Sequence, residues 1–222
     1  MIDVQGQWRT WGINLLWALL LVGIPVTSFP WIADRFADAA VSPLSILPLV
    51  ILLPVFLLTD FLRGGRFPFI LWPILGFVLA TGVAAGVGFL LPIEPIKGQT
   101  LISRELRAGV TLIVGLAFYF VASRLAAKGD RLRWTLGAIY IGGILALIWA
   151  TVQANYVIRG LNDVPQHLNQ IHRWVSVRDL ERNRVTGLAF EPSWLADQLV
   201  VLYLPLWLSA IVTGRSILPF RR

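Results

Sequence analysis

The run WTLGAIYIGGILALIWATVQANYVI, residues 134–158, decides the fold because it contains no charged side chain. A helix needs about 20 consecutive apolar residues to cross the hydrocarbon core of a bilayer, and this run is longer. Lipid offers the backbone no hydrogen-bond partner, so a spanning segment of this length satisfies its own peptide groups by forming a helix. We therefore predict a transmembrane helix over 134–158.

Similar apolar runs occur throughout the chain, in which 57% of the residues are hydrophobic and 14% are charged. A soluble domain carries about a quarter charged residues, so the composition indicates an integral membrane protein. We expect an all-α fold, a polytopic bundle of six transmembrane helices that forms a single domain over 1–222. A signal peptide in the first run, with ADA at 37–39 as the cleavage site, is an alternative that the length of the run disfavours. The other predicted spans are 11–33, 39–59, 67–93, 108–123 and 192–214.

The distribution of Lys and Arg between the loops predicts the orientation, because these residues are more frequent on the cytoplasmic side. With the N-terminus in the cytoplasm, the inner segments carry ten basic and three acidic residues, and the outer segments carry nine of each. The single arginine of the 34–38 loop, against four basic residues in 124–133, favours this orientation. We therefore expect both termini to be cytoplasmic and the segment 159–191 to be external.

The external segment 159–191 is unusual because it holds five of the nine outer basic residues. Within it, 162–182 is predicted to form an amphipathic helix that lies on the membrane surface before the last span. Asn162 or Asp163 is positioned to cap this helix, and Pro165 suits its first turn. Arginine on the translocated side runs against the usual bias, so we expect a need for positive charge there.

One face of this predicted helix begins with an apolar stripe and ends in the guanidinium groups of Arg178 and Arg182. In one hypothesis, these arginines meet the phosphates of ordinary lipid headgroups. In the other, they form with Arg184 an anion site for a diphosphate, whose oxygens a planar guanidinium binds two at a time. The stripe consists of Val164, Leu168, Ile171 and Val175.

The remaining polar and small residues favour structural roles. His167 and His172 lie on the predicted surface helix without a spacing typical of a metal site or a catalytic triad. The spacing of Gly82 and Gly86, and the glycine pair at 142–143, predict close helix packing. The chain has no cysteine and no nucleotide-binding or metal-binding motif, so we expect no metal and no cofactor. Its net charge of +7 is assigned to membrane topology, and nucleic acid is not an expected partner.

The stretch RVTGLAFEPSWLADQL, residues 184–199, resembles the bacterial O-antigen ligase and O-antigen polymerase family. Arg184 and Gly187 match the family pattern Arg-x-x-Gly. The Pro-centred turn EPS at 191–193 and the small residue Ala196 match the opening of the family's next span. Many members have an Asn-Pro-Asn-like turn in place of Glu-Pro-Ser, so the resemblance leaves ligase and polymerase both open.

The resemblance implies a metal-independent glycosyltransferase of the bacterial inner membrane, with its site on the external face. Such an enzyme moves a glycan from undecaprenyl diphosphate to an acceptor sugar hydroxyl, so its partners are a lipid-linked oligosaccharide and membrane lipids. It implies that Arg184 binds the donor's phosphates, supported by Arg178 and Arg182, and that Gly187 forms the turn. Glu191 is then either a catalytic candidate that polarises the acceptor or the cap of the next helix. Proline at the following position favours the cap.

Members of this family are longer, with further spans and another external loop that carries an Arg and a His. The resemblance covers only the N-terminal half of such a protein, so we expect the chain to be a fragment. A partner polypeptide that supplies the missing half, or a loss of activity, is the alternative. A transporter or flippase of lipid-linked saccharides and a non-catalytic membrane subunit are competing functions, although spans almost free of charge disfavour a transporter.

Overall fold

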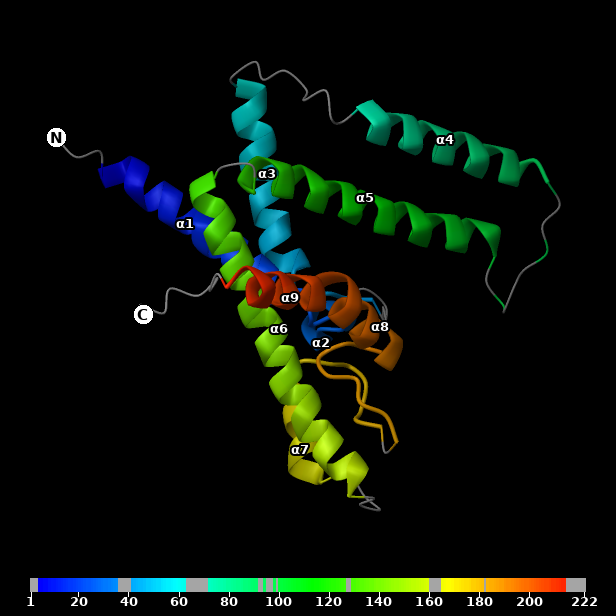
Figure 1. The fold of residues 1–222 in the computed structure, drawn as a ribbon. Helices are drawn as coiled ribbons and strands as arrows, with labels where there is room; N and C mark the ends of the chain where they lie inside the picture. Colours follow the sequence, from blue (N-terminus) through cyan, green and yellow to red (C-terminus); the bar gives the residue numbers. More distant parts are fainter. Residues whose placement is uncertain are drawn as a thin grey trace. The chain divides into compact units, whose positions relative to one another are not determined.

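The computed structural model describes residues 4–35, 41–62, 72–91, 94, 98, 100–126, 129–159, 165–181 and 183–214. Helices make up the regular structure of these residues, with two isolated β-bridges besides (Figure 1). In chain order the elements are α1 (Val4–Val22), α2 (Pro30–Ala33), α3 (Ile46–Leu62), α4 (Trp72–Phe89), α5 (Leu101–Leu125), α6 (Gly129–Ile158), α7 (Gln166–His172), α8 (Pro192–Asp197), the π-helical turn η2 (Gln198–Tyr203) and α9 (Leu204–Thr213).

The chain divides into two compact units. One comprises Met1–Leu52 together with Ala122–Arg222, and the other comprises Leu53–Val121. The first unit contains α1, α6 and the stretch from α7 to α9, and it holds the segment that carries the candidate site. The second unit contains α4 and most of α5.

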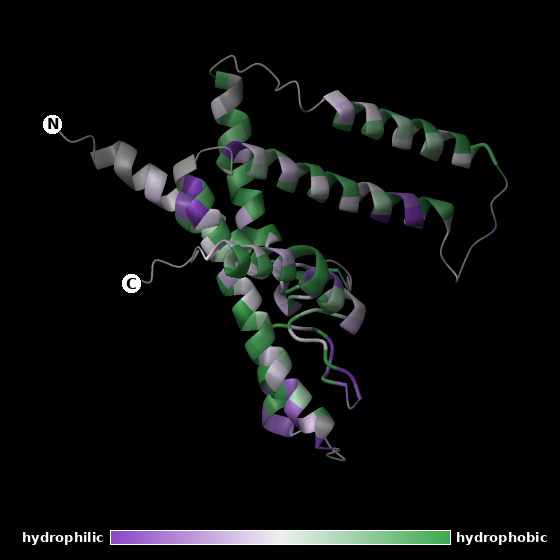
Figure 2. Cartoon of the chain, viewed as in Figure 1, coloured by the Kyte–Doolittle hydropathy of each residue, from purple (hydrophilic) through white to green (hydrophobic). Residues whose placement is uncertain are grey.

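Within the described residues, four helical stretches are long and apolar enough to cross a membrane. They are Trp72–Phe89, Leu101–Leu125, Arg131–Val157 and Pro192–Thr213, the last formed by α8, η2 and α9 in succession. Figure 2 shows hydrophobic residues along these helices and a hydrophilic stretch in the loop that precedes α8. The prediction of an all-α, multi-pass membrane protein agrees with this fold.

The first predicted span, 11–33, is wrong as a single helix. Helix α1 ends at Val22, and its apolar part, Thr10–Val22, is shorter than the four spanning stretches. A turn at 23–25 follows, in which Pro25 cannot donate a backbone hydrogen bond. Beyond it, the chain pairs with a later segment and does not continue the helix, because Ser42 N–H donates to Thr27 O at 3.0 Å and Phe29 N–H donates to Ser42 O at 2.8 Å.

The same pairing shortens the second predicted span, 39–59. Helix α3 begins at Ile46, because residues 41–45 are held in a non-helical connection by bonds such as Leu44 N–H to Val26 O at 3.0 Å. Its apolar part is Ile46–Thr59. Both predicted spans are therefore shorter helices whose ends are determined by contacts between the segments that join them.

Helix α6 packs against α1 on one side and against η2 and α9 on another (Figure 1). A Cβ placed on Gly142 would lie 3.1 Å from Val22 O, and one placed on Gly143 would lie 2.6 Å from Tyr203 Cδ1. Trp17 Nε1 of α1 also donates a hydrogen bond of 2.9 Å to Thr135 Oγ1 of α6. The prediction that the glycine pair allows close helix packing is therefore confirmed.

The corresponding prediction for Gly82 and Gly86 in α4 is wrong for the described residues. A Cβ placed on either glycine would meet nothing within 4 Å. No residue of α4 is buried against the described part of the chain.

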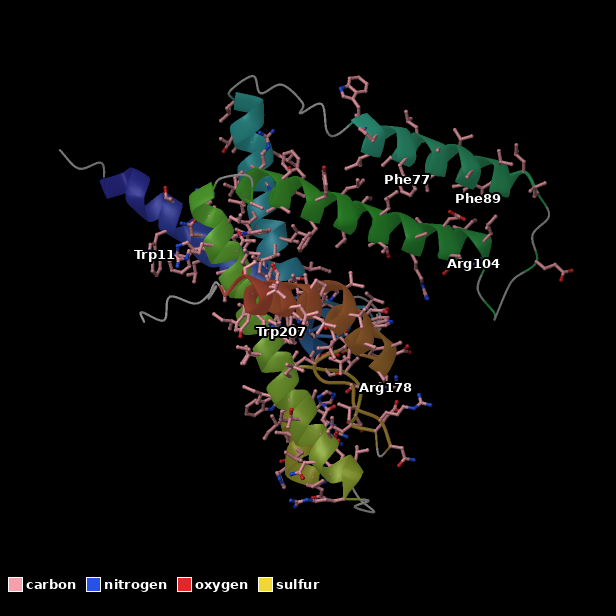
Figure 3. All side chains as sticks on the ribbon, viewed as in Figure 1. Trp11, Phe77, Phe89, Arg104, Arg178 and Trp207 are labelled. Carbon is pink, nitrogen blue, oxygen red and sulfur yellow. The ribbon has the colours of Figure 1, made fainter. Side chains whose placement is uncertain are left out.

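The last spanning stretch contains an irregular turn. Leu204 N–H donates to Leu199 O, five residues back, which closes the π-helical turn η2 just before Pro205. A proline inside a helix lacks its N–H and crowds the carbonyl four residues earlier, and a widened turn accommodates both effects. Tyr203 in this turn is fully buried and stacks on Trp207, with ring centroids 5.7 Å apart. Figure 3 labels Trp207 where α9 passes α6.

Candidate functional site

The segment 173–191, here called the arginine loop, connects α7 to α8. The long surface helix predicted over 162–182 is wrong beyond its first turns, because α7 covers only Gln166–His172. After α7, Val177 N–H donates to Ser28 O at 3.0 Å, and the hydroxyls of Ser176 and Ser28 share a hydrogen bond of 2.9 Å. These long-range bonds replace the helical ones, so the predicted alignment of Arg178 with the apolar stripe does not form.

The start of α7 also differs from the prediction. Pro165 is the N-cap residue, and among the described residues no side chain makes a capping hydrogen bond to the helix. The predicted caps, Asn162 and Asp163, lie outside the described residues, as do Val164 of the stripe and Arg182.

The arginine loop is bonded to the connection between α1 and α3. Besides the Ser28–Ser176 bond, Phe190 N–H donates to Thr27 Oγ1 at 2.8 Å. Ser28, Ser42 and Ser176 are all buried at this junction. The two connections therefore lie together, on one side of the helices that they join.

The Arg-x-x-Gly motif is held by a side chain of α6, Gln153, which is fully buried. Its Oε1 accepts hydrogen bonds of 2.9 Å from both Thr186 N–H and Gly187 N–H, and its Nε2 donates one of 2.9 Å to Gly187 O. The amide thus satisfies three backbone groups of a turn that the chain buries beside α6. A buried backbone group without a partner is destabilising, so this turn depends on Gln153.

Gly187 meets a backbone requirement in the same turn. Its φ of 60° lies in the left-handed region, which residues with a Cβ rarely adopt. A Cβ there would also lie 3.0 Å from Leu195 Cδ1 of α8. Leu195 forms a small core with Ala150 and Ala189, so the glycine allows the turn to pack between α6 and α8.

Sequence reasoning missed Gln153. Its signal was present, because a glutamine within the uncharged and mostly apolar run 134–158 needs a hydrogen-bond partner if the run lies in lipid. The sequence alone does not identify that partner, since the bonded groups are backbone atoms 33 and 34 residues later.

Two arginines of the loop share one carboxylate. The guanidinium of Arg178 forms an ion pair with Oε1 of Glu181, and Nε of Arg184 lies 3.6 Å from Oε2 of the same residue. Arg178 is further held by Phe190, whose carbonyl lies 3.5 Å from Nη1 and whose ring centre lies 5.3 Å from Cζ. The Arg178 side chain, labelled in Figure 3, is 36% exposed and that of Arg184 is 66% exposed, so Arg184 is the more accessible cation.

A third arginine of the loop is paired separately. Arg173 binds Asp179 through two hydrogen bonds, of 2.6 and 2.9 Å. The hydrogen bond from Arg173 holds the pKa of Asp179 below its ordinary value. Each of Arg173, Arg178 and Arg184 thus has a carboxylate partner within the chain. The expectation that the segment 159–191 needs positive charge stays a prediction, and these three arginines meet it as members of ion pairs.

Glu191 occupies the N-cap position of α8, and Pro192 follows in the first turn as predicted. The predicted side-chain cap is wrong, because the carboxylate makes no capping hydrogen bond to the helix. Instead, Oε1 lies 3.9 Å from Nη1 of Arg178 and Oε2 lies 3.5 Å from Ser193 Oγ. The carboxylate therefore lies between Arg178 of the loop and a hydroxyl in the first turn of α8.

The two histidines of α7 differ in their surroundings. His167 is exposed, whereas His172 is buried against α6, where its Nδ1 accepts a hydrogen bond of 3.1 Å from Trp149 Nε1. Burial lowers the pKa of His172 to about 4, although the charge of Asp179 opposes this effect. His172 is therefore neutral at physiological pH and joins α7 to α6.

The fold and the arginine loop define a class, an α-helical multi-pass membrane protein with a charge-paired loop between two spans. Among the residues with a described placement, no group of three or more His, Cys, Asp or Glu side chains is arranged to hold a metal ion. Comparison with known proteins found no matching family model, no similar curated protein and no similar solved structure.

Proposed function

We propose that this protein binds the diphosphate of an undecaprenyl-linked glycan at the external face of the bacterial inner membrane and takes part in glycan transfer to an acceptor sugar. In this proposal, α1 and α3 also cross the membrane, which gives six spans with the N-terminus in the cytoplasm. The observation that carries the proposal is the anchored Arg184-x-x-Gly187 turn, whose backbone is buried while its arginine side chain is 66% exposed.

The anchoring matters because a binding group is most effective when its position is fixed before the ligand arrives. Gln153 fixes the backbone at Thr186 and Gly187, two and three residues beyond Arg184. The loop lies where α6 ends and α8 begins, which is the level of lipid headgroups if both helices span the membrane. A guanidinium at that level meets the diphosphate of a lipid-linked sugar and binds its oxygens in pairs.

The chemistry requires stabilisation of a leaving diphosphate. The acceptor hydroxyl oxygen attacks the anomeric carbon, the bond from that carbon to the phosphate oxygen breaks, and undecaprenyl diphosphate leaves with the bonding electrons. Arg184 stabilises the charge that develops on this leaving group. Glu191, whose side chain is 45% exposed, is the carboxylate proposed to accept the hydroxyl proton.

The test compares Arg184→Ala and Arg184→Lys with the wild type in nanodiscs that contain an undecaprenyl-diphosphate-linked glycan, with an acceptor sugar added for the transfer assay. Loss of a guanidinium that contacts phosphate should reduce affinity, and any transfer rate, by roughly a hundredfold, with a smaller loss for lysine, which cannot bind bidentately. Arg173→Ala is the matched control, because it removes an exposed arginine of the same loop that pairs only with Asp179 in the described contacts. Equal binding by wild type and Arg184→Ala would remove the proposed role.

A further inference from the structure

Glu181 pairs with Arg184, which the proposed function places at the diphosphate, and with Arg178, which the family resemblance adds as a supporting cation. Its two carboxylate oxygens are divided between them, Oε1 with Arg178 and Oε2 with Arg184. The Glu181 side chain is 25% exposed, less than either arginine, so it sits between the two cations and not at the rim. A ligand that binds both guanidinium groups must therefore displace this carboxylate.

The charges of this cluster cancel. Arg178 and Arg184 contribute two positive charges, and Glu181 and Glu191 contribute two negative ones. An arriving anion consequently meets no surplus positive charge from these four side chains. Its binding depends on exchange with a carboxylate already in place, and an exchange of one negative group for another yields little free energy.

We propose that Glu181 is a specificity-determining residue, which occupies Arg178 and Arg184 until an anion with two phosphoryl groups displaces it. This inference rests on the proposed function, because it concerns the same ligand and the same arginines. Its consequence is that singly charged phosphodiester groups, which surround any loop at a membrane surface, do not occupy the site.

The preference for a diphosphate over a phosphodiester arises from the way in which each anion replaces the Glu181 carboxylate. The two guanidinium groups contact opposite oxygens of one carboxylate, so they are close enough for one anion to bridge them. A phosphodiester brings a single charge and replaces Glu181 one for one. A diphosphate brings more charge and two groups of acceptor oxygens, so it engages both guanidinium groups at once.

Arg178 is held in place when Glu181 leaves. Its remaining partners are Glu191 at 3.9 Å and the carbonyl and ring of Phe190. These contacts keep one side of the site formed, whereas the exposed Arg184 side chain is free to adjust to the ligand. In this exchange the side chains of Glu181 and Arg184 move, while Arg178 and the loop backbone stay in place.

The experiment measures anion binding to the full chain in phosphatidylcholine nanodiscs by calorimetry. Inorganic pyrophosphate represents a diphosphate, and dimethyl phosphate represents a lipid phosphodiester. The wild type should favour pyrophosphate strongly. Glu181→Gln keeps the side-chain shape but removes its charge, so affinity for dimethyl phosphate should rise about tenfold and the preference for pyrophosphate should fall.

Asp179→Asn is the matched control. It also removes one negative charge, two positions from Glu181, but this carboxylate pairs with Arg173. It should leave the ratio of the two affinities unchanged. An unaltered ratio in Glu181→Gln, or an equal change in Asp179→Asn, would overturn the proposal. Pyrophosphate binding that Arg184→Ala abolishes but Glu181→Gln leaves unchanged would overturn only the role of Glu181. Absence of binding in every variant would overturn the proposed function as well.

Discussion

Helices α6 and α4 are both long, apolar and rich in glycine, yet the chain surrounds them differently. In α6, added Cβ atoms on Gly142 and Gly143 would collide with α1 and with η2. In α4, a Cβ on Gly82 or Gly86 would meet nothing within 4 Å, and no residue is buried by the described chain. Small residues therefore mark a closely packed helix in α6, whereas in α4 the described residues make no close contact with them.

The difference between α6 and α4 shows which sequence features, besides glycine, indicate that a helix packs against the protein. Helix α6 carries Gln153, whose hydrogen bonds join it to a turn that lies far along the chain. Helix α4 has no charged residue and no comparable amide, so nothing in its sequence requires a protein partner. A polar group inside an apolar run is a stronger indication of packing than glycine spacing, because lipid cannot satisfy it.

The largest expected effect comes from Gln153→Leu. This change fills a similar volume but leaves two amide groups and one carbonyl of the 186–187 turn without partners. Each buried unsatisfied group costs about 1–3 kcal/mol, so thermal unfolding in mild detergent should occur at a much lower temperature. Hydrogen exchange at the amides of Thr186 and Gly187 should accelerate as well.

Asn155→Leu provides the control on the same helix, because Asn155 is exposed. It should leave the unfolding temperature and the exchange of the 186–187 amides unchanged. If Gln153→Leu behaved in the same way, the amide of α6 would not be what distinguishes it from α4.

A smaller loss of stability is expected when alanine replaces a glycine of α6, and none when it replaces a glycine of α4. The added methyl of Gly143→Ala would lie 2.6 Å from Tyr203 Cδ1 and 2.9 Å from Trp207 Cζ2. Overpacking of this kind costs about 1–3 kcal/mol, whereas Gly86→Ala enters open space and should cause no loss. Unfolding temperatures of the two variants under identical conditions test the difference, and equal values would contradict the closer packing of α6.

The spanning helices could be predicted from sequence, because length without charge is a local property. The ends of α1 and α7 could not. Propensity and periodicity extend both helices, but bonds from the 26–29 segment to Ser42 and Ser176 end them. Such long-range pairs have no local signature in a single sequence.

For the candidate site, the turn at Gly187 could be predicted from the sequence, but the ion pairs of the arginines could not. The importance of Gly187 as a turn residue followed from the motif, and its positive φ agrees with that prediction. The surroundings of Arg178 and Arg184 did not follow, because both pair with Glu181, which received no role in the sequence analysis. Glu181 lies three positions from each arginine in the sequence, and the loop conformation decides that it pairs with both.

The smallest expected effect concerns His172, which the first unit buries against Trp149. Burial lowers its pKa to about 4 from an ordinary value of 6.5, so the unfolded chain binds more protons than the folded chain between these values. Stability is therefore complete above pH 6.5 and falls as the pH falls through this window, by about 1 kcal/mol at pH 5.5. His172→Gln keeps an acceptor for Trp149 but does not titrate, so its unfolding temperature should change less between pH 7.5 and 5.5. A decrease equal to that of the wild type would place the titration in another group, and would leave α7 joined to α6 by contacts that do not depend on a neutral imidazole.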